Sequence, residues 1–181
     1  TRAFKHHLFS QKGQIMQALV PALAISLLIV PVGAAQEVQS SAGVLTATVL
    51  SEGLDHPWAL AFLPDGRLLV TERSGPIAGT PDVYNQGQGG LLDVALAPDF
   101  AESGKIYLTF AEKAADAGLQ RGQGTAVMVA RLVLEGDAGR LEDQQVIFRM
   151  NKFTTTNRHF GSRVVVGNDG NLFVTLGERG E

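Results

Sequence analysis

The chain has 181 residues, of which 45% are hydrophobic and 18% charged, with 21 glycines, 7 prolines and no cysteine. This composition is that of a globular, turn-rich protein and excludes a disordered chain. Because no disulfide is available, a sizeable hydrophobic core has to stabilise the fold. The formal net charge of −3 at pH 7 offers no attraction to nucleic acid or to an anionic membrane.

The first 35 residues differ in composition from the rest. Three basic residues and no acidic residue precede Glu37, and the apolar run "ALVPALAISLLIVPV" ends in "GAAQ". This order predicts a secretory signal peptide over residues 1–35, cleaved near Ala35, and a periplasmic protein without stable membrane association. A transmembrane anchor is the alternative, but two prolines interrupt a run that is short for a span. Because the chain begins at Thr1 rather than Met, we expect a segment of a longer reading frame.

From residue 36 onward the sequence predicts an all-β fold. The expected strands are rich in Val, Leu, Ile or Phe and are bounded by Gly, Pro, Asp or Asn. They are Val44–Leu50, Trp58–Leu63, Arg67–Thr71, Leu92–Ala97, Lys105–Phe110, Ala126–Leu134, Gln144–Phe148, Arg163–Gly167 and Asn171–Leu176. No helix is predicted, and the segment "EKAADAGLQRG" is expected to be a loop.

Three of the expected hairpins are copies of one unit. The stretches "WALAFLPDGRLLVTE", "LDVALAPDFAESGKIYLTF" and "SRVVVGNDGNLFVTLGE" superpose once four inserted residues are allowed in the middle copy. The alignment matches Thr71 with Thr109 and Thr175. Repeated antiparallel hairpins without helices indicate a β-propeller, in which each blade covers its neighbour. A β-sandwich is the alternative, because turn spacing alone does not exclude it.

The number of hairpins is too small to close a ring, because propellers usually have at least four blades. Residues 36–181 are therefore predicted to be the N-terminal part of a propeller domain. The strand Val44–Leu50 has no partner in the repeat and is expected to complete the last blade. The chain between Gly75 and Tyr84 is short, so the first blade is expected to lack a strand. Unpaired edges predict that the segment alone has marginal stability.

The repeat also predicts which polar residues meet. His56, Gln88 and His159 each precede the first strand of a hairpin, and Glu178 follows the second strand of the last one. Because the strands of a hairpin are antiparallel, both positions lie on the same rim. A site is therefore expected on that rim, around His159 and Glu178. Two other residues are expected to have structural roles: His56 in a turn, because Pro57 follows it, and Glu112, the repeat partner of Glu178, as a residue that closes a turn.

Three motifs resemble a known family. In order and spacing, "HPWALAFLPDGRLLVTER", "GQGGLLDVALAPDF" and "HFGSRVVVGNDGNLFVTLGERG" are similar to the soluble quinoprotein aldose sugar dehydrogenases of the glucose/sorbosone dehydrogenase family. The resemblance covers nearly all of Val44–Glu181. It implies the opening blades of a six-bladed propeller that uses pyrroloquinoline quinone (PQQ) and calcium.

The resemblance also implies a reaction and its residues. An aldose would be oxidised at its anomeric hydroxyl to a lactone, with hydride transfer to PQQ and then to an external electron acceptor. His159 would be the general base, Glu178 would orient it, and Gln88 would bind the sugar. Arg158 stands where soluble glucose dehydrogenases carry an aspartate, so it is assigned to substrate binding. The residues that bind PQQ and calcium are expected beyond Glu181, so the segment alone is expected to be inactive.

Two other functional classes stay open at this stage. One is a calcium-dependent propeller lactonase or related hydrolase, which would carry acidic metal ligands on the rim of several blades. The other is a non-catalytic propeller that binds a partner on its rim. No metal site is predicted in this chain, because its four histidines lack metal-binding spacing. No dinucleotide site is predicted either, because the glycine-rich stretches do not complete a fingerprint and no helix follows them.

Overall fold

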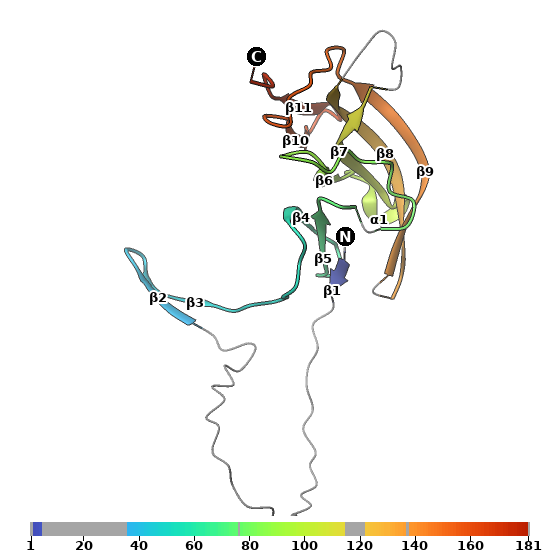
Figure 1. Ribbon diagram of the computed structural model, residues 1–181. Coiled ribbons are helices and arrows are strands. Elements are labelled where there is room, and N and C mark those ends of the chain that lie inside the picture. Colours follow the sequence, from blue (N-terminus) through green and yellow to red (C-terminus); the bar gives the residue numbers. More distant parts are fainter. Residues whose placement is uncertain (1, 5–35, 76, 115–121, 137, 181) are drawn as a thin grey trace, which may run out of the picture. The chain divides into compact units, whose positions relative to one another are not determined.

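The computed structural model describes residues 2–4, 36–75, 77–114, 122–136 and 138–180 (Figure 1). Almost all of the predicted signal peptide and most of the predicted loop at 112–122 lie outside the described residues. The chain divides into two compact units, His7–Gly53 and Leu54–Glu181, and the second unit also includes Thr1–His6. The one helix of the described part has four residues, far fewer than a membrane span needs.

The smaller unit contributes one exposed hairpin. Strand β2 (Gln36–Ser40) pairs antiparallel with β3 (Gly43–Ala47), from Gln36 opposite Ala47 to Ser40 opposite Gly43. In the turn, Ser40 Oγ donates a hydrogen bond to the Gly43 carbonyl at 2.8 Å. The prediction of a strand at Val44–Leu50 was therefore only partly right: the strand ends at Ala47, and its partner is its own neighbour in sequence.

The larger unit contains three antiparallel sheets, and all the hairpins predicted from the repeat are confirmed. The first sheet has the order β1-β5-β4, the second β6-β7-β8-β9 and the third β10-β11. The strands are β1 (Arg2–Phe4), β4 (Pro57–Phe62), β5 (Leu68–Glu72), β6 (Leu91–Leu96), β7 (Lys105–Lys113), β8 (Gln123–Glu135), β9 (Ala138–Arg149), β10 (Gly161–Val166) and β11 (Leu172–Leu176). Strand β1, which pairs with β5, was not predicted. In the described residues between Gly75 and Tyr84, an isolated bridge from Ala78 to Arg140 replaces a strand.

The expectation of no helix was wrong at one place. Helix α1 (Phe100–Ser103) is a single turn between β6 and β7, and it is formed by the four inserted residues of the middle repeat. It ends at Gly104, whose left-handed backbone (φ 66°) lets its N–H bond the Phe100 carbonyl. A left-handed glycine is a common helix end because it has no Cβ to clash. The turn thus absorbs the insertion without disturbing the hairpin.

The core lies between the first sheet and the four-stranded sheet. Most of its buried side chains come from β5 to β9, and along β7 and β8 they occupy alternate positions, as expected for strands with one covered face. They are Leu63, Leu69, Ile77, Leu91, Val94, Ile106, Leu108, Phe110, Ala126, Met128, Ala130, Leu132 and Leu141. A second, smaller cluster joins Tyr84, Leu92, Ala111 and Phe160, and Trp58 packs against it. This second cluster brings together residues from all three repeated hairpins.

The aligned threonines Thr71, Thr109 and Thr175 each bond the first strand of their own hairpin. In all three copies the first strand carries a bulge, where one backbone N–H is left without a ladder partner. The threonine Oγ1 accepts that N–H, at 3.1 Å from Ala59, 2.9 Å from Asp93 and 3.0 Å from Arg163.

The same hydroxyl groups join consecutive hairpins. Thr71 Oγ1 donates to the Leu92 carbonyl at 2.6 Å, and Thr109 Oγ1 donates to the Ser162 carbonyl at 2.7 Å. Each acceptor carbonyl belongs to the bulge of the next hairpin. Both threonines are fully buried. In this arrangement the hydroxyl accepts a hydrogen bond from the bulge of its own hairpin and donates one to the bulge of the next hairpin. We call it the threonine clasp.

A buried carboxylate adds a second connection between the middle and last hairpins. Asp93 on β6 is 1% exposed and accepts the Val164 N–H at 2.8 Å and the Arg163 guanidinium at 2.9 Å. The Arg163 guanidinium also lies 5.1 Å from the centre of the Trp58 ring. A buried carboxylate is stable only when such donors satisfy its oxygens. Strand β10 is therefore fixed against β6 by its backbone as well as its side chains.

The clasp predicts a specific loss of stability for Thr109→Val. Valine has the same shape but no hydroxyl, so the Asp93 N–H and the Ser162 carbonyl lose their partner inside the protein. Each buried polar group left unsatisfied costs about 1–3 kcal/mol, so the free energy of unfolding falls by that amount or more. Equilibrium denaturation with urea measures the change.

Two variants serve as controls for this measurement. Thr109→Ser keeps the hydroxyl and is expected to lose clearly less stability than Thr109→Val. Thr46→Val, on the exposed strand β3, changes stability by no more than about 0.5 kcal/mol. Equal stability of Thr109→Val and the unsubstituted protein would show that the clasp does not hold the hairpins together.

Candidate active site

Three loops meet on one rim of the larger unit. The segments 85–90 and 154–160 precede β6 and β10, and 177–180 follows β11. Gln88 N–H donates to the Asn157 carbonyl at 2.7 Å, and Gly177 N–H donates to the Phe160 carbonyl at 3.2 Å. The structure thus brings Gln88, His159 and Glu178 together, from positions up to 90 residues apart in sequence.

His159 and Glu178 form the central pair of this rim. The imidazole Nδ1 hydrogen-bonds to Glu178 Oε1, and Glu178 Oε2 accepts the Gly180 N–H. The Gly180 N–H, followed by the His159 side chain, lowers the pKa of the Glu178 carboxyl below its ordinary value. Glu178 is therefore an ionised, acceptor-only group at neutral pH.

The state of Glu178 determines the tautomer of the neutral imidazole. Since a carboxylate only accepts, His159 Nδ1 must carry the hydrogen, and Nε2 keeps its lone pair. Among the described residues, His159 Nε2 has no hydrogen-bond partner, and the side chain is 47% exposed. The pair is thus arranged so that Nε2 can accept a proton from a bound molecule.

Gln88 holds the backbone of this histidine. Its side-chain Oε1 accepts the His159 N–H at 2.7 Å, which leaves the amide Nε2 without a partner among the described residues. The contact requires the two loops to lie very close. A Cβ on Gly87 would lie 2.4 Å from the Asn157 carbonyl oxygen, and a Cβ on Gly177 would lie 1.7 Å from the His159 carbonyl oxygen. Glycine at positions 87 and 177 therefore allows these loops to lie this close together.

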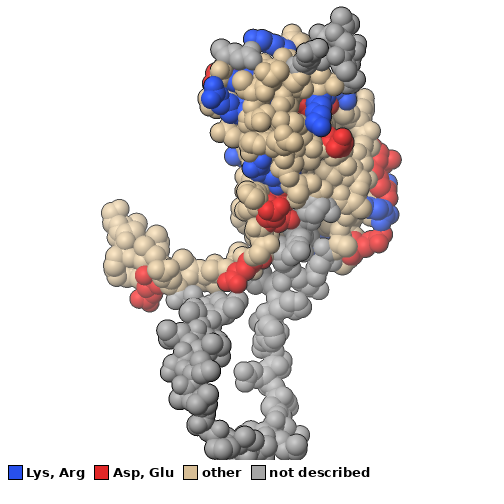
Figure 2. All heavy atoms as spheres, viewed as in Figure 1, with Lys and Arg blue, Asp and Glu red and all other residues tan. Residues whose placement is uncertain are grey.

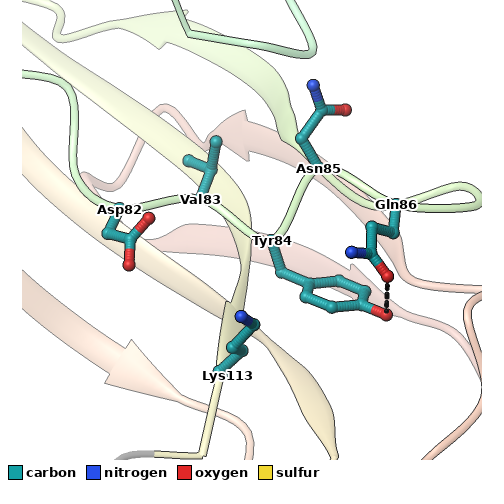
Figure 3. Close-up of a pocket in the computed structure, with 6 residues that line it drawn as sticks. All are labelled: Asp82, Val83, Tyr84, Asn85, Gln86 and Lys113. Atoms are coloured by element: carbon teal, nitrogen blue, oxygen red, sulfur yellow. Dashed lines mark hydrogen bonds between the residues drawn. The ribbon is translucent and has the colours of Figure 1, made fainter.

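A polar network supports the loop that carries His159. Asn157 Oδ1 accepts Gln123 Nε2 at 2.8 Å and the Tyr84 hydroxyl at 2.7 Å. The same hydroxyl donates to Gln86 Oε1 at 3.1 Å. Tyr84 and Lys113 both line a polar cavity of about 130 Å³, whose lining residues are drawn in Figure 3. The network connects the 85–90 loop to the 154–160 loop.

His159 also lines a larger open cavity, of about 300 Å³. Its walls combine the second hydrophobic cluster with polar groups of the rim: Trp58, Arg73, Gly87, Gln88, Leu92, His159, Phe160 and Gly161. A cavity of this size suits a small molecule rather than a macromolecule. On its wall the imidazole can exchange a proton with a ligand, and the Gln88 amide can donate a hydrogen bond to it.

The other residues considered in the sequence lie elsewhere. Arg158 donates to the Gly180 carbonyl at 3.3 Å and does not line the cavity. Glu112 lies within β7, where it forms an ion pair with Arg149 at 3.0 Å. His56 lies in an exposed turn with a left-handed backbone (φ 50°), and its Nδ1 is 2.6 Å from Asp55 Oδ1. These three are therefore outside the His159 cavity.

Two arginines at this rim were not found by sequence reasoning. Arg73 donates to the Gly89 and Gly87 carbonyls at 2.8 and 2.5 Å and so fixes the loop that carries Gln88. Arg179 is 1% exposed and contacts the loop before β10. The two arginines share one feature of the sequence that could have indicated them. Each comes shortly after the second strand of a repeated hairpin and directly follows a glutamate.

The described residues do not form a metal site. No three His, Asp or Glu side chains gather there in a way that could hold an ion. Charged side chains gather instead along the outer strands β8 and β9 (Figure 2), where Arg131 and Arg140 pair with Glu142. These pairs are exposed, and such pairs add little stability.

Comparison with known proteins shows where this architecture occurs. Residues 54–181 match the family model described as glucose/sorbosone dehydrogenase. An aldose sugar dehydrogenase of Escherichia coli is 44% identical over 147 residues, which are 74% of this chain and 38% of that protein. The quinoprotein glucose dehydrogenase B of Acinetobacter calcoaceticus is 26% identical over 83% of this chain and 34% of that protein. The chain thus spans less than two fifths of the length of these relatives.

A solved structure agrees with the family match. The PQQ-bound form of an aldose sugar dehydrogenase from Streptomyces coelicolor has a TM-score of 0.58 and is 29% identical, over 71% of this chain and 40% of that one. The antiparallel hairpins of the larger unit are those of a partial β-propeller, as the repeat predicted. Since the family model covers more than half of the sequence, this chain belongs to the glucose/sorbosone dehydrogenase family.

Proposed function

We propose that the protein oxidises the anomeric hydroxyl of an aldose to a lactone, with His159 as the general base and PQQ as the hydride acceptor. The observation that carries this proposal is the His159–Glu178 pair, whose Nε2 is left open in a small-molecule cavity. The family match supports the sugar as substrate, and the PQQ-bound relative supports the quinone.

The chemistry requires the removal of two hydrogens from the sugar. His159 Nε2 would take the hydroxyl proton as the C1–H bond breaks, and a bound two-electron acceptor would take the hydride of that bond. Negative charge that develops on the sugar oxygen makes hydride loss easier, so a base at this oxygen accelerates the step. Glu178 stabilises the imidazolium that forms, because its carboxylate accepts the Nδ1 hydrogen.

Gln88 and Arg158 are the proposed contacts to the sugar. The Gln88 side chain is anchored through Oε1 on the His159 N–H, so its free amide Nε2 is held at the cavity wall as a donor. Arg158 would have to turn away from the Gly180 carbonyl to reach a ligand. Its guanidinium only donates hydrogen bonds, so it favours sugar oxygens that accept them.

The described residues suit the proposed general base, but they do not form a binding site for PQQ or calcium. PQQ has three carboxylates, and among the residues that line the cavity Arg73 carries the cationic group, already bonded to the Gly87 and Gly89 carbonyls. The described part of the chain also has no acidic cluster for calcium. No residue of this chain is therefore assigned to either cofactor, and the proposal of PQQ and calcium rests on the family. PQQ would supply the two-electron acceptor.

We also propose a periplasmic location and an external electron acceptor. The location rests on the charge and hydropathy order of residues 1–35, nearly all outside the described residues. A reduced cofactor has to be reoxidised between turnovers, which requires an acceptor other than the sugar.

The proposed base predicts the effect of His159→Asn in the protein expressed from its whole reading frame. Asparagine keeps a hydrogen-bonding group of similar reach but cannot accept the proton, so kcat is expected to fall by about 10²- to 10⁴-fold. Steady-state dye reduction with several aldoses, PQQ and calcium measures this loss.

The matched control is His56→Asn, which changes a histidine that also has a left-handed backbone but lies in an exposed turn. Its kcat is expected to stay at the level of the unsubstituted enzyme, while its melting temperature changes. An active His159→Asn enzyme would refute the assignment of the base.

Glu178→Gln tests the partner of the base through pH. The variant keeps the histidine but replaces the ionised acceptor, so kcat is expected to fall by about 10- to 100-fold, the equivalent of the roughly 1.5–3 kcal/mol of a hydrogen bond to a charged group. Because the carboxylate stabilises the imidazolium, its loss moves the acidic limb of the pH–rate profile to lower pH. A profile identical to that of the unsubstituted enzyme would contradict the proposed role.

Stability measurements provide a second reading of the same variant. The folded protein lowers the pKa of the Glu178 carboxyl, so its contribution to stability is complete above the ordinary glutamate pKa. It is lost as the pH falls through the lower folded value. The difference in stability between the unsubstituted protein and Glu178→Gln is therefore expected to shrink on acidification across that range.

A further inference from the structure

Arg179 is a charged side chain in an unusual place. It directly follows Glu178, yet it is 1% exposed and is the largest fully buried side chain among the described residues. Arginine is rarely buried unless its donors are satisfied. Here Nη1 donates to the Arg158 carbonyl at 2.5 Å and Nη2 donates to the Thr156 carbonyl at 2.8 Å.

The guanidinium also lies on an aromatic ring. Its central carbon is 3.5 Å from the centre of the Phe160 ring, a distance at which cation and ring attract. The contacts of Arg179 thus fall at residues 156, 158 and 160, on both sides of His159. In return, Thr156 Oγ1 donates to the Arg179 carbonyl. One side chain therefore grips two backbone carbonyls before the base and the aromatic ring of the residue after it.

The backbone on both sides of this grip is strained. His159 has φ 53° and Arg179 has φ 68°, the left-handed region that residues with a Cβ seldom adopt. Such conformations persist only where surrounding contacts hold them. At His159 these contacts are the Gln88 side chain on its N–H and the Arg179 guanidinium on the carbonyl of Arg158, the residue before it.

We propose that Arg179 is a positioning residue, which fixes the 156–160 loop so that the His159 imidazole stays on Glu178 and presents Nε2 to the cavity. The proposal rests on the proposed function of His159 as the base. The two consecutive residues then have different roles. Glu178 holds the imidazole, and Arg179 holds the backbone of the loop that carries it. A displacement of about 1 Å from reactive geometry can cost about 100-fold in rate, so the grip is expected to affect turnover.

The planar fork of arginine is essential to this role. Two separate carbonyls and a ring face are contacted at once by different parts of the guanidinium. A lysine ammonium is compact and cannot satisfy both carbonyls in the same geometry while it stacks on the ring. Arg179→Lys therefore keeps the charge and removes the grip.

The test compares Arg179→Lys with the unsubstituted enzyme expressed from its whole reading frame. We expect kcat to fall by about 10- to 100-fold with little change in KM. We also expect the acidic limb of the pH–rate profile to move to lower pH, as in Glu178→Gln, because the imidazole no longer stays on the carboxylate. Arg140→Lys, at an exposed ion pair on β9, is the control and should leave kcat and the profile unchanged.

A purely structural role predicts a different result. Arg179→Lys would then lower the melting temperature, but well below that temperature kcat and the pH–rate profile would match the unsubstituted enzyme, and that outcome overturns the inference. Thr156→Val covers the case in which Arg179→Lys does not fold. It removes the hydroxyl bond to the Arg179 carbonyl, together with a contact to the Thr154 hydroxyl at 3.2 Å. It should shift kcat and the profile in the same direction, by less, and an unshifted profile in this variant also overturns the inference.

Different results would refute the proposed function of His159 and the proposed role of Arg179. If His159→Asn retains turnover, the proposed function is wrong whatever Arg179→Lys does. If His159→Asn is inactive and either Arg179→Lys or Thr156→Val keeps the original kcat and pH–rate profile, only the positioning role is wrong.

Discussion

The threonine hydroxyl at each hairpin bulge is the contact on which the arrangement of the hairpins depends. The three sheets of the larger unit share no ladder hydrogen bonds, so backbone pairing does not align one hairpin with the next. Apolar packing alone is non-directional and leaves the register loose. A buried hydroxyl that must both accept and donate fixes two groups at once, because either one left unsatisfied is costly. Thr71 and Thr109 meet both conditions.

The same constraint places the rim. Thr109 holds the Ser162 carbonyl and Thr125 holds the Phe160 carbonyl at 3.0 Å, so the chain is fixed just after His159 by buried groups of the four-stranded sheet. From the other side, Gln88 holds the His159 N–H. Contacts from three separate parts of the chain therefore fix the position of the backbone that carries the imidazole. Loops of this kind are precise when a rigid scaffold positions their ends.

The sequence predicted the hairpins well because their apolar pattern and their Asp-Gly or Asn-Asp-Gly turns agree. It underestimated β9, which begins at Ala138 rather than Gln144. The early part of that strand is polar, and its arginine and glutamate residues are satisfied by partners on β8 that periodicity cannot reveal. The one-turn helix was missed because four residues are too few to show a helical period.

The part of the site that could be predicted is the part whose positions are set by the hairpin repeat. The antiparallel hairpin placed the ends of its two strands on one rim, and His159 and Glu178 lie in contact there. Arg73 and Arg179 were not predictable in the same way. An arginine in a sequence normally indicates exposed surface, and its burial here depends on carbonyls that loops 14 to 23 residues away bring to it.

The third hairpin shows what the clasp does when its second partner is not within the described residues. Thr175 accepts the Arg163 N–H as its two equivalents do, but no described carbonyl accepts its own proton. Unlike buried Thr71 and Thr109, it is exposed, and Phe173 on the same strand is 60% exposed. Burial of a hairpin therefore follows from the neighbour that its threonine contacts, rather than from its own apolar content. Among the described residues, the hairpin that carries the His159–Glu178 pair is held on the side of the middle hairpin by the buried groups of Asp93, Thr109 and Thr125.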